Sequence, residues 1–426
     1  MRTAAYALAK IIHQDTPNMP DVETLIIGGG IAGASTALYL ARLGGAVALL
    51  ERGEIASEAS GANAGQIGAT GWGDVPDLGA YLTMGSLQLF KELQLDLGYD
   101  IEFRQSGSLT AIHTPEQYDY MRGRVDAQRS HGHQVELITP REARSLDPEI
   151  NPEMLGYMHT PLRAQADPVK ATRAFARAAS SAGARILTNH AVTGIEPTSD
   201  GGYEVATSNG RGRFETGPYR CQSLVIAAGA WCGPLGEMLG LRIPIVPVRG
   251  QMWATESLPP SVFQTMSSAE SAYAYSMDDR SDANTPPELT HRGNTRVTRH
   301  LYGRQRRNGE IIFGGDRQLV GYDKTVEPTG IEVNKGHASE VIPMLSSLPI
   351  SRTWAGLMPF SLDGEPLIGS IPRRDNLYIA SGLASSGFGR GPMTGKLLAE
   401  FIHTGHRHPV LAESDPARCV TEIDTI

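Results

Sequence analysis

The chain has 426 residues, 40% of them hydrophobic and 20% charged, with a formal net charge of −8 and 3 cysteines. This composition is ordinary for a globular protein long enough for two domains, and the negative charge opposes a general attraction to nucleic acid or to an anionic membrane. No apolar run approaches the about 18 residues of a membrane-spanning helix, and cysteines without a Cys-x-x-Cys pair favour a reducing compartment. We expect a cytoplasmic protein without a nucleic-acid partner or membrane association, and the oligomeric state stays open.

The first predicted unit is a strand, a tight turn and a helix. The apolar run Val22–Ile27 leads into Gly28, Gly30 and Gly33 at GxGxxG spacing, and helix-forming residues 34–42 follow. The first glycine permits the turn, the second allows the backbone to approach a pyrophosphate, and the third allows close packing of helix on strand. The pattern predicts a dinucleotide site at the positive end of a helix.

A second apolar run, residues 46–50, ends in Glu51. This acid follows Gly33 by roughly the 20 residues expected of a group that binds a nucleotide ribose. A carboxylate accepts hydrogen bonds from a free 2′-hydroxyl group and repels a 2′-phosphate. The motif therefore favours FAD or NAD over NADP, and it does not choose between the first two.

Further elements follow in chain order. Residues 55–73 are rich in Gly, Ala and Ser, which predicts a loop that covers the cofactor rather than a core layer. Asp167 and Pro168 are typical of a helix start, and that helix should end at Gly183. Apolar periodicity predicts a helix at residues 77–98 and strands at residues 108–112, 185–188, 191–195, 203–207 and 224–229.

The second half of the chain changes character. Strand-like pieces at residues 244–255, 297–302 and 310–315 predict a mostly β domain, and the polar residues 278–294 predict a surface loop. A glycine-rich turn at residues 382–389 should precede a helix at residues 393–402.

The predicted fold class is therefore α/β, with a Rossmann-type domain interleaved with a mostly antiparallel β substrate domain. The expected limits are 21–100, 155–240 and 352–410 for the first domain, 101–154 and 241–351 for the second, and 1–20 and 411–426 for terminal extensions.

The chain resembles the superfamily of FAD-dependent D-amino acid oxidase, glycine oxidase and sarcosine oxidase, in blocks spread along its length. The blocks are Gly28–Gly33 with Glu51 and Arg52, Ala59–Gln66, Ala166–Pro168, Val192, Val225–Trp231, Pro247–Gln251, Trp354–Pro359, Asp363–Gly369 and Gly382–Ala399.

The resemblance implies a glutathione-reductase-like flavoprotein that binds FAD. It also implies oxidation of a C–N bond by hydride transfer to flavin N5, giving an imine that hydrolyses, with oxygen or another acceptor taking the electrons. Leu383 stands where several relatives have a histidine, and no cysteine lies in the flavin blocks, so we expect noncovalent FAD.

The resemblance also implies which residues contact FAD, while no residue is assigned with certainty as catalytic. The implied residues are Gly28, Gly30, Ile31, Ala32, Gly33, Glu51, Arg52 and Val192 around the adenosine, Ser60, Asn63, Ala64, Gly65 and Gln66 near the flavin, Ala228, Gly229 and Trp231 along the pyrophosphate, and Gly356, Ser386, Gly387, Phe388 and Gly389 in the last blocks.

Met358 is the main departure from the family pattern. Amino-acid oxidases of this superfamily carry an arginine in the matching Gly-Leu-Arg-Pro block, where it clamps the substrate carboxylate, and a thioether cannot do so. The substrate is therefore an amine without a carboxylate at that place, or an amino, imino or opine-like acid held by another cation. Candidate cations are Arg249, Arg304 and Arg306.

For other candidate residues, a purely structural role is the alternative to a functional one. Tyr273, Tyr275 and Tyr302 are candidates for an aromatic substrate cage, although tyrosines on strands are more often simply packed. The arginine-rich residues 292–307, with His300, predict either a mouth that attracts anions or a charged strand edge. His131, His133 and His190 lack metal-ligand spacing, so no metal is expected.

Two rival functions stay open. A flavin monooxygenase should carry an NAD(P)H-binding signature, and no second GxGxxG after a strand is present. A flavoprotein subunit would instead pass electrons from its FAD to a partner inside a complex.

Overall fold

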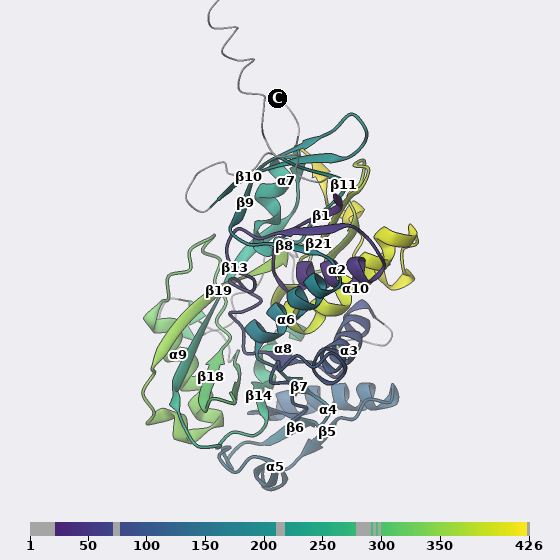
Figure 1. Cartoon of the computed structure of the whole chain (residues 1–426). Coiled ribbons are helices and arrows are strands. Elements are labelled where there is room, and N and C mark those ends of the chain that lie inside the picture. The colour runs from purple at the N-terminus through teal and green to yellow at the C-terminus, as the bar shows by residue number, and fades with distance from the viewer. Residues whose placement is uncertain are drawn as a thin grey trace, which may run out of the picture.

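The computed structural model contains two large sheets with helices around them (Figure 1). It describes residues 22–70, 77–209, 218–277, 291–292, 295–296 and 300–423. Within these ranges, no helix has the length and apolar character needed to cross a membrane. The predicted surface loop at residues 278–294 lies almost entirely outside the described residues, as do residues 1–20.

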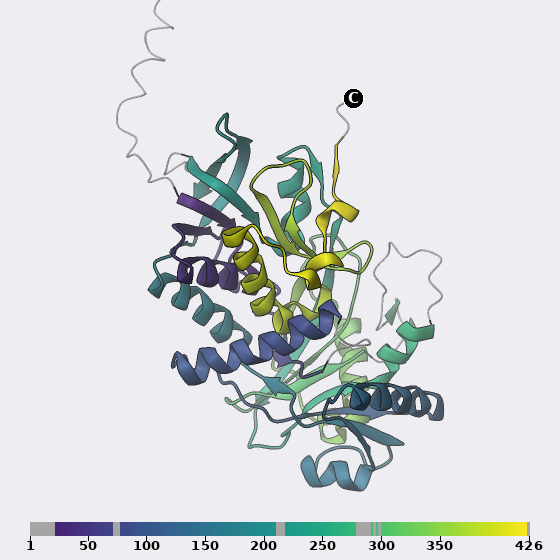
Figure 2. The ribbon, with the colours of Figure 1, turned by 90° about the vertical axis from the view of Figure 1, so that its right-hand side faces the viewer.

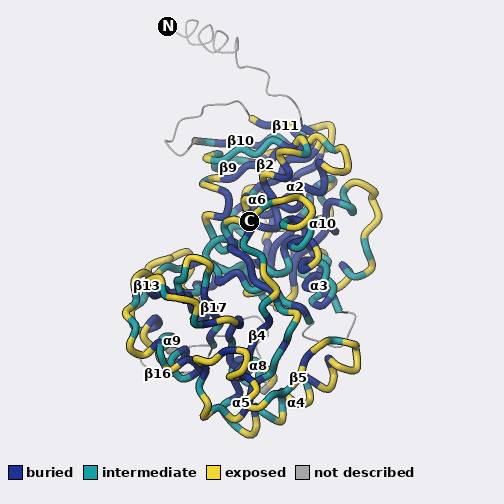
Figure 3. Tube along the Cα trace, turned by 60° about the horizontal axis from the view of Figure 1, so that its bottom comes forward, coloured by how far each residue is buried: buried dark blue, intermediate teal, exposed yellow. Residues whose placement is uncertain are grey.

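The first sheet is the predicted Rossmann sheet, and its central strands are almost completely buried (Figure 3). Four of its described pairings are parallel, and the three antiparallel ones involve the strands at residues 190–197, 203–209 and 367–370. The strand order is β20 (Leu367–Ser370), β21 (Leu377–Ser381), β11 (Tyr219–Ile226), β1 (Val22–Ile27), β2 (Val47–Leu50) and β8 (Arg185–Leu187), with β10 (Tyr203–Asn209) and β9 (His190–Pro197) added to β11 in antiparallel order.

Glycines allow the helices of this domain to pack closely. A Cβ atom on Gly391 would lie 2.4 Å from Ile31 Cγ2, and one on Gly395 would lie 2.2 Å from Ser35 Oγ. The glycines therefore bring α10 (Gly387–Thr404) against α2 (Ile31–Arg42). Figure 2 shows α10 beside α3, and the packed helices are α2, α3 (Leu78–Lys91), α6 (Pro168–Ser181) and α10.

The second sheet forms the other half of the molecule. All of its pairings are antiparallel except that of β14 with β4. The order is β19 (Arg352–Ser361), β13 (Ile245–Ser257), β18 (Glu310–Gly314), β17 (Tyr302–Gln305), β14 (Thr265–Ser268), β4 (Ser108–Ile112), β6 (Gly156–Thr160) and β5 (Glu136–Ile138).

Helices cover this second sheet as well. Trp253 is fully buried, stacks on Phe313 at a centroid distance of 5.8 Å, and donates through Nε1 to Asn334 Oδ1 at 2.8 Å. Asn334 lies on α9 (Pro328–Val341), so this bond ties the helix to the sheet core. The other helices here are α4 (Pro115–Ser130), α5 (Pro140–Leu146) and α8 (Ala269–Met277).

Short elements complete the chain. They are β3 (Gln66–Ile67) paired with β7 (Ala164–Gln165), β12 (Leu241–Arg242) paired with β22 (Thr421–Glu422), β15 (His291–Arg292) paired with β16 (Thr295–Arg296), and α7 (Cys232–Glu237).

The structure differs from the predicted domain limits in three places. Strands β6 and β19 pair in the second sheet, although the predicted limits at 155 and 352 assign them to the first domain. Residues 411–423 are no loose extension, because Leu411 is fully buried and β22 pairs with β12.

Candidate cofactor and substrate site

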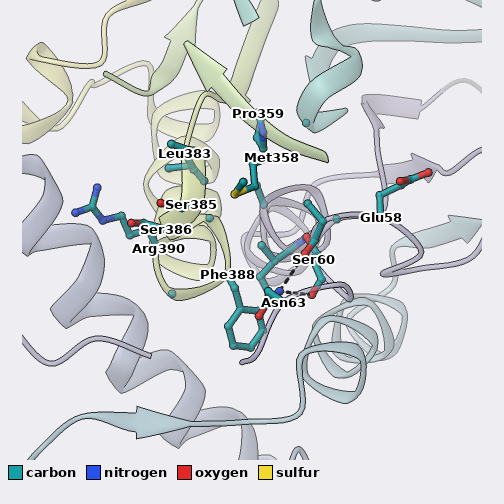
Figure 4. Close-up of a pocket in the computed structure, with 18 of the residues that line it drawn as sticks. Glu58, Ser60, Asn63, Met358, Pro359, Leu383, Ser385, Ser386, Phe388 and Arg390 are labelled. Carbon is teal, nitrogen blue, oxygen red and sulfur yellow. Dashed lines mark hydrogen bonds between the residues drawn. The ribbon is translucent and has the colours of Figure 1, made fainter. Parts of the chain in front are cut away.

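One cavity of about 480 Å³ is lined by residues of both halves of the molecule (Figure 4). The first half contributes the turn after β1, residues 51–70, the turn after β11 and the start of α10. The second half contributes residues of β4, β6, β14, β17 and β19. We call these two parts the dinucleotide end and the substrate end.

The glycine turn at the dinucleotide end depends on close backbone contacts. Gly28 has a φ of +118°, and a Cβ there would lie 2.4 Å from Ala227 O. A Cβ on Gly33 would lie 2.0 Å from Gly28 O. Both positions therefore exclude side chains, which is the role the fingerprint predicts for them.

Glu51 is nearly buried at the end of β2. Its two carboxylate oxygens accept hydrogen bonds from Gly29 N and Gly53 N, each at 2.7 Å. These bonds hold the carboxylate at the rim of the glycine turn, and both glycine-turn and carboxylate line the cavity. Glu51 thus stands where an acid can accept a hydrogen bond from a ribose hydroxyl group.

Arg52 is fixed beside the cavity by two neighbours. It pairs with Glu58 at 2.6 Å, and its guanidinium carbon lies 3.7 Å from the centre of the Trp231 ring. Trp231 stacks in turn on Tyr322, whose hydroxyl group donates to Ala230 O at 3.1 Å. These contacts fix the planar groups of Arg52 and Trp231 at the wall of the dinucleotide end.

The covering loop is held by its own side chains. Asn63 Nδ2 donates to Ala59 O and Ser60 O, each at 3.0 Å, and Asn63 Oδ1 accepts from Gly65 N at 2.7 Å. Gln66 Nε2 donates to Met266 O at 3.2 Å, which ties the loop to the second sheet. The loop therefore bridges the two ends of the cavity.

Two helix N-termini lie at the cavity, and both fit an anionic dinucleotide. Gly30 precedes α2 and Ser386 precedes α10, and neither N-cap residue makes a side-chain capping bond. At α2 the Ile31 N–H instead donates to Ser60 Oγ at 2.9 Å. Backbone N–H groups and two positive helix ends at one cavity suit the pyrophosphate and the electron-accepting ring of FAD.

The substrate end has a floor of side chains from four neighbouring strands. Met158 faces Thr110, Thr110 faces Ser267, and Ser267 faces Tyr302 across the ladders of β6, β4, β14 and β17. Because paired residues share one face of a sheet, this row points into the cavity as a unit, and all four residues line it. The hydroxyl groups of Thr110 and Ser267 lie 2.8 Å apart.

Tyr302 of this floor and its neighbour His300 are both uncharged at neutral pH. Burial raises the pKa of Tyr302 to about 12 and lowers the pKa of His300 to about 4. Both residues line the cavity, with ring centres 6.3 Å apart. They can therefore orient a substrate without carrying charge.

Met358 also lines the cavity, on β19. Figure 4 shows its thioether between Ser385 and Ser386 on one side and Ser60 and Asn63 on the other. The same view shows the guanidinium group of Arg390 pointing away from Met358. At the place where relatives carry the clamping arginine, this chain thus has an uncharged side chain among polar neighbours.

The three arginines proposed to replace that clamp do not line the cavity. Arg249 donates to Gln318 Oε1 and to Thr325 O, the latter at 2.6 Å. Arg306 pairs with Asp167 at 2.7 Å and with Glu310.

Arg304, the third of them, is buried among backbone and amide oxygens. Its guanidinium group donates to Ala166 O at 2.9 Å, to Gln165 Oε1 at 3.0 Å and to Ala64 O. In all three arginines the guanidinium group is thus turned toward protein acceptors. The expectation that one of them binds the substrate is corrected on that ground.

Of the predicted tyrosine cage, Tyr302 lines the cavity and Tyr273 does not. Tyr273 lies on helix α8 rather than on a strand, and its ring packs edge-on against Tyr120 at 5.8 Å instead of lining the cavity. The side chain of Tyr275 lies outside the described residues, as do those of Arg292, Arg296 and Arg299. Arg307 pairs with Asp100. Within the described part of residues 292–307, the cavity is lined by His300, Leu301 and Tyr302.

The structure brings most of the implied FAD-binding residues together, although their contacts with FAD stay predictions. Gly33, Ala64, Gly65 and Gly356 do not line the cavity and support its walls instead. Those that line it are Gly28, Gly30, Ile31, Ala32, Glu51, Arg52, Ser60, Asn63, Gln66, Val192, Ala228, Gly229, Trp231, Ser386, Gly387, Phe388 and Gly389.

Sequence reasoning missed three cavity arginines and the strand floor. Arg124, Arg163 and Arg390 line the cavity. No motif surrounds Arg124 or Arg163, and Arg390 lies in the block Gly382–Ala399 without a predicted role. The floor residues could have been paired only with knowledge of the strand register. Among the described residues, no group of three or more His, Cys, Asp or Glu side chains forms a metal site.

Comparison with known proteins places this geometry in a family. Residues 23–401 match the model of the FAD dependent oxidoreductase family, DAO. Glycine oxidase of Bacillus licheniformis is 28% identical over 89% of this chain and 92% of its own length, and sarcosine oxidase subunit beta of Rhizobium meliloti (strain 1021) is 28% identical over 91% and 85%. The crystal structure of glycine oxidase from Geobacillus kaustophilus superimposes with a TM-score of 0.79 at 25% identity, covering 94% of this chain and all of that one. The chain therefore belongs to the FAD dependent oxidoreductase family, and FAD is its cofactor.

Proposed function

We propose that this protein oxidises a C–N bond of an amine, amino acid or opine-like substrate with noncovalently held FAD. The observation that carries the proposal is the continuity of the cavity, because the FAD-type glycine turn and the strand floor line the same space. The names of the similar proteins support it, since one is a glycine oxidase and another belongs to a sarcosine oxidase.

FAD, when bound, accepts a hydride from the carbon next to the substrate nitrogen, and the resulting imine hydrolyses in water. The residues of the chain orient the substrate and exclude water, and do not act as acids or bases. Thr110, Ser267 and Tyr302 offer neutral hydroxyl groups that can orient the amine, while Met158 and Met358 offer apolar surface that excludes water. Hydride transfer depends mainly on such orientation and desolvation.

The start of α10 adds an electrostatic contribution. Gly387, Phe388 and Gly389 place the first backbone N–H groups of this helix at the cavity wall. The positive end of the helix favours negative charge at this wall. It would therefore stabilise the flavin ring once the ring holds the electrons taken from the substrate.

The test is anaerobic reduction of the purified yellow holoprotein by a panel of primary amines, secondary amines and amino acids. We expect at least one member of the panel to bleach the flavin absorption within minutes. If every member leaves the flavin oxidised while dithionite reduces it, C–N oxidation is wrong.

The second candidate function is that of an electron-transferring subunit. It is supported by the similarity to a sarcosine oxidase subunit. Turnover of the isolated chain with oxygen or with an artificial dye would contradict this candidate. A flavin reduced by amines that then fails to react with either acceptor would favour it, and NADPH consumption would instead favour a monooxygenase. The cytoplasmic location stays a prediction, and the oligomeric state stays open.

A further inference from the structure

Arg163 is a cation at the cavity whose charge is uncompensated. It follows β6 by three residues and lies directly before β7, and its backbone is fixed because Arg163 N donates to Thr160 O at 3.2 Å and Arg163 O accepts from Gly107 N at 2.9 Å. Its side chain lines the cavity, and its Nε atom is buried without a hydrogen-bond partner. A buried donor that lacks a partner costs free energy unless a ligand satisfies it.

The other arginines at the cavity differ from Arg163 in this respect. Arg52 pairs with Glu58, Arg390 Nε donates to Thr83 Oγ1 at 3.3 Å, and Arg124 Nη1 donates to Tyr120 Oη at 3.2 Å. For Arg163, by contrast, no ion pair or hydrogen bond of the guanidinium group is found within the described residues.

The charges along the cavity wall also favour an anion near Arg163. The carboxylates among the described lining residues are Glu51 and Glu58, and both belong to the segment after β2 at the dinucleotide end. Glu51 already accepts two backbone hydrogen bonds and Glu58 pairs with Arg52. Burial lowers the pKa of Arg163 to about 10, which leaves the guanidinium group charged at neutral pH.

Arg163 lies at the end of the substrate floor, because Met158 and Thr160 of the preceding strand both line the cavity. Its other chain neighbour, β7, pairs with β3, which carries the cavity residue Gln66. Arg163 is thus placed where the strand floor meets the covering loop. A fork of N–H donors at that place matches the two oxygens of a carboxylate.

We infer that Arg163 binds the carboxylate of an amino-acid substrate, and so takes the role that the residue at position 358 cannot perform. The inference rests on the proposed function, and it narrows the substrate class from amines in general to amines that carry a carboxylate. Met358 then contacts an apolar part of the same substrate.

The test uses two unreactive probes that differ in charge, pyrrole-2-carboxylate and pyrrole-2-carboxamide. Each is titrated into the FAD-loaded protein, and binding is followed by the change in flavin absorption. The variants are Arg163→Met, which keeps side-chain bulk, and Arg163→Lys, which keeps the charge. The matched control is Arg122→Met, because Arg122 is exposed on α4 and pairs with Asp119 at the surface.

We expect the unchanged protein to bind the carboxylate at least about 10-fold more tightly than the carboxamide. Arg163→Met should weaken carboxylate binding by about 10- to 100-fold, the value of one charge-assisted hydrogen-bonding pair, and leave carboxamide binding within about 3-fold. The affinity of Arg163→Lys for the carboxylate should lie between those of the unchanged protein and of Arg163→Met. Arg122→Met should bind both probes as the unchanged protein does.

Several outcomes would overturn the inference. The first is that the unchanged protein binds both probes with equal affinity. The second is that Arg163→Met binds the carboxylate as tightly as the unchanged protein does. The third is that Arg163→Met loses affinity for both probes to the same extent. Loss of FAD from both Arg163 variants would assign the residue to the cofactor instead. Because the titration needs no turnover, a protein that no amine reduces but that binds the carboxylate through Arg163 would contradict the proposed function alone.

Discussion

The two ends of the cavity are built on opposite principles. At the dinucleotide end the charged groups are satisfied within the protein, since Glu51 accepts two backbone hydrogen bonds and Arg52 pairs with Glu58. At the substrate end Arg163 has a buried, unpartnered donor, and the floor offers neutral hydroxyl groups. Charged groups that are already paired within the protein suit a permanently bound cofactor. An unpaired cation suits a substrate that binds and is released.

The largest expected effect is at the glycine turn. Gly33→Ala places a Cβ 2.0 Å from Gly28 O, so strand and helix must move apart. We expect the protein to lose most of its FAD and several degrees of Tm, measured by the flavin-to-protein absorbance ratio and by thermal unfolding. The matched control is Gly336→Ala, because Gly336 is exposed on α9 and a Cβ there meets no atom within 4 Å, so this variant should keep its FAD.

Glu51→Gln tests whether the Glu51 carboxylate, held by its two backbone hydrogen bonds, contributes to FAD binding. The amide keeps the shape but places an NH₂ group against Gly29 N or Gly53 N, both of which are donors. We expect FAD to bind about 10- to 100-fold more weakly, measured by titration of the apoprotein with FAD. The exposed Glu153→Gln is the control, and unchanged FAD affinity in Glu51→Gln would remove the carboxylate from the cofactor site.

Met358→Arg would make the substrate end resemble that of the amino-acid oxidases. A second guanidinium group beside the floor should raise the ratio of kcat/KM for an amino acid over its decarboxylated amine by about 10-fold. Met358→Gln, polar but uncharged, is the control and should leave that ratio within about 2-fold. A ratio that does not move in Met358→Arg would mean that position 358 faces no part of the substrate near the carboxylate.

The smallest expected effect concerns the stability of the substrate half. Burial raises the pKa of Asp147 to about 6, although its Oδ2 accepts from Phe263 N at 2.7 Å and from Gln264 N at 3.0 Å. The unfolded chain loses this proton near pH 4, so the stabilising contribution of the group is present below that pH and is lost as the pH rises to about 6.

Asp147→Asn does not titrate. The Tm of the unchanged protein relative to this variant should therefore fall by a few degrees between pH 4 and pH 7, and the exposed Asp126→Asn should show no such trend. A Tm difference that is flat across that range would show that the pKa of Asp147 is not raised.

The two ends also differ in how far the sequence predicts them. The glycine turn and Glu51 were predictable because their spacing along the chain is itself the physical requirement. The role of Arg163 was not predictable. Whether a guanidinium group has a partner depends on which side chains surround it in the folded protein, and the sequence around Arg163 does not show this. The end of the glycine-rich turn predicted at residues 382–389 belongs instead to α10, because this helix begins at Gly387. Within the helix, Gly391 and Gly395 allow the close contact with α2.

The central claim is tested most directly by anaerobic flavin reduction with a matched pair of substrates, proline and pyrrolidine, which differ by one carboxylate. In the unchanged protein the amino acid should reduce the flavin at least about 10-fold faster at low concentration, and in Arg163→Met that advantage should vanish. An advantage of equal size in both proteins would contradict the account.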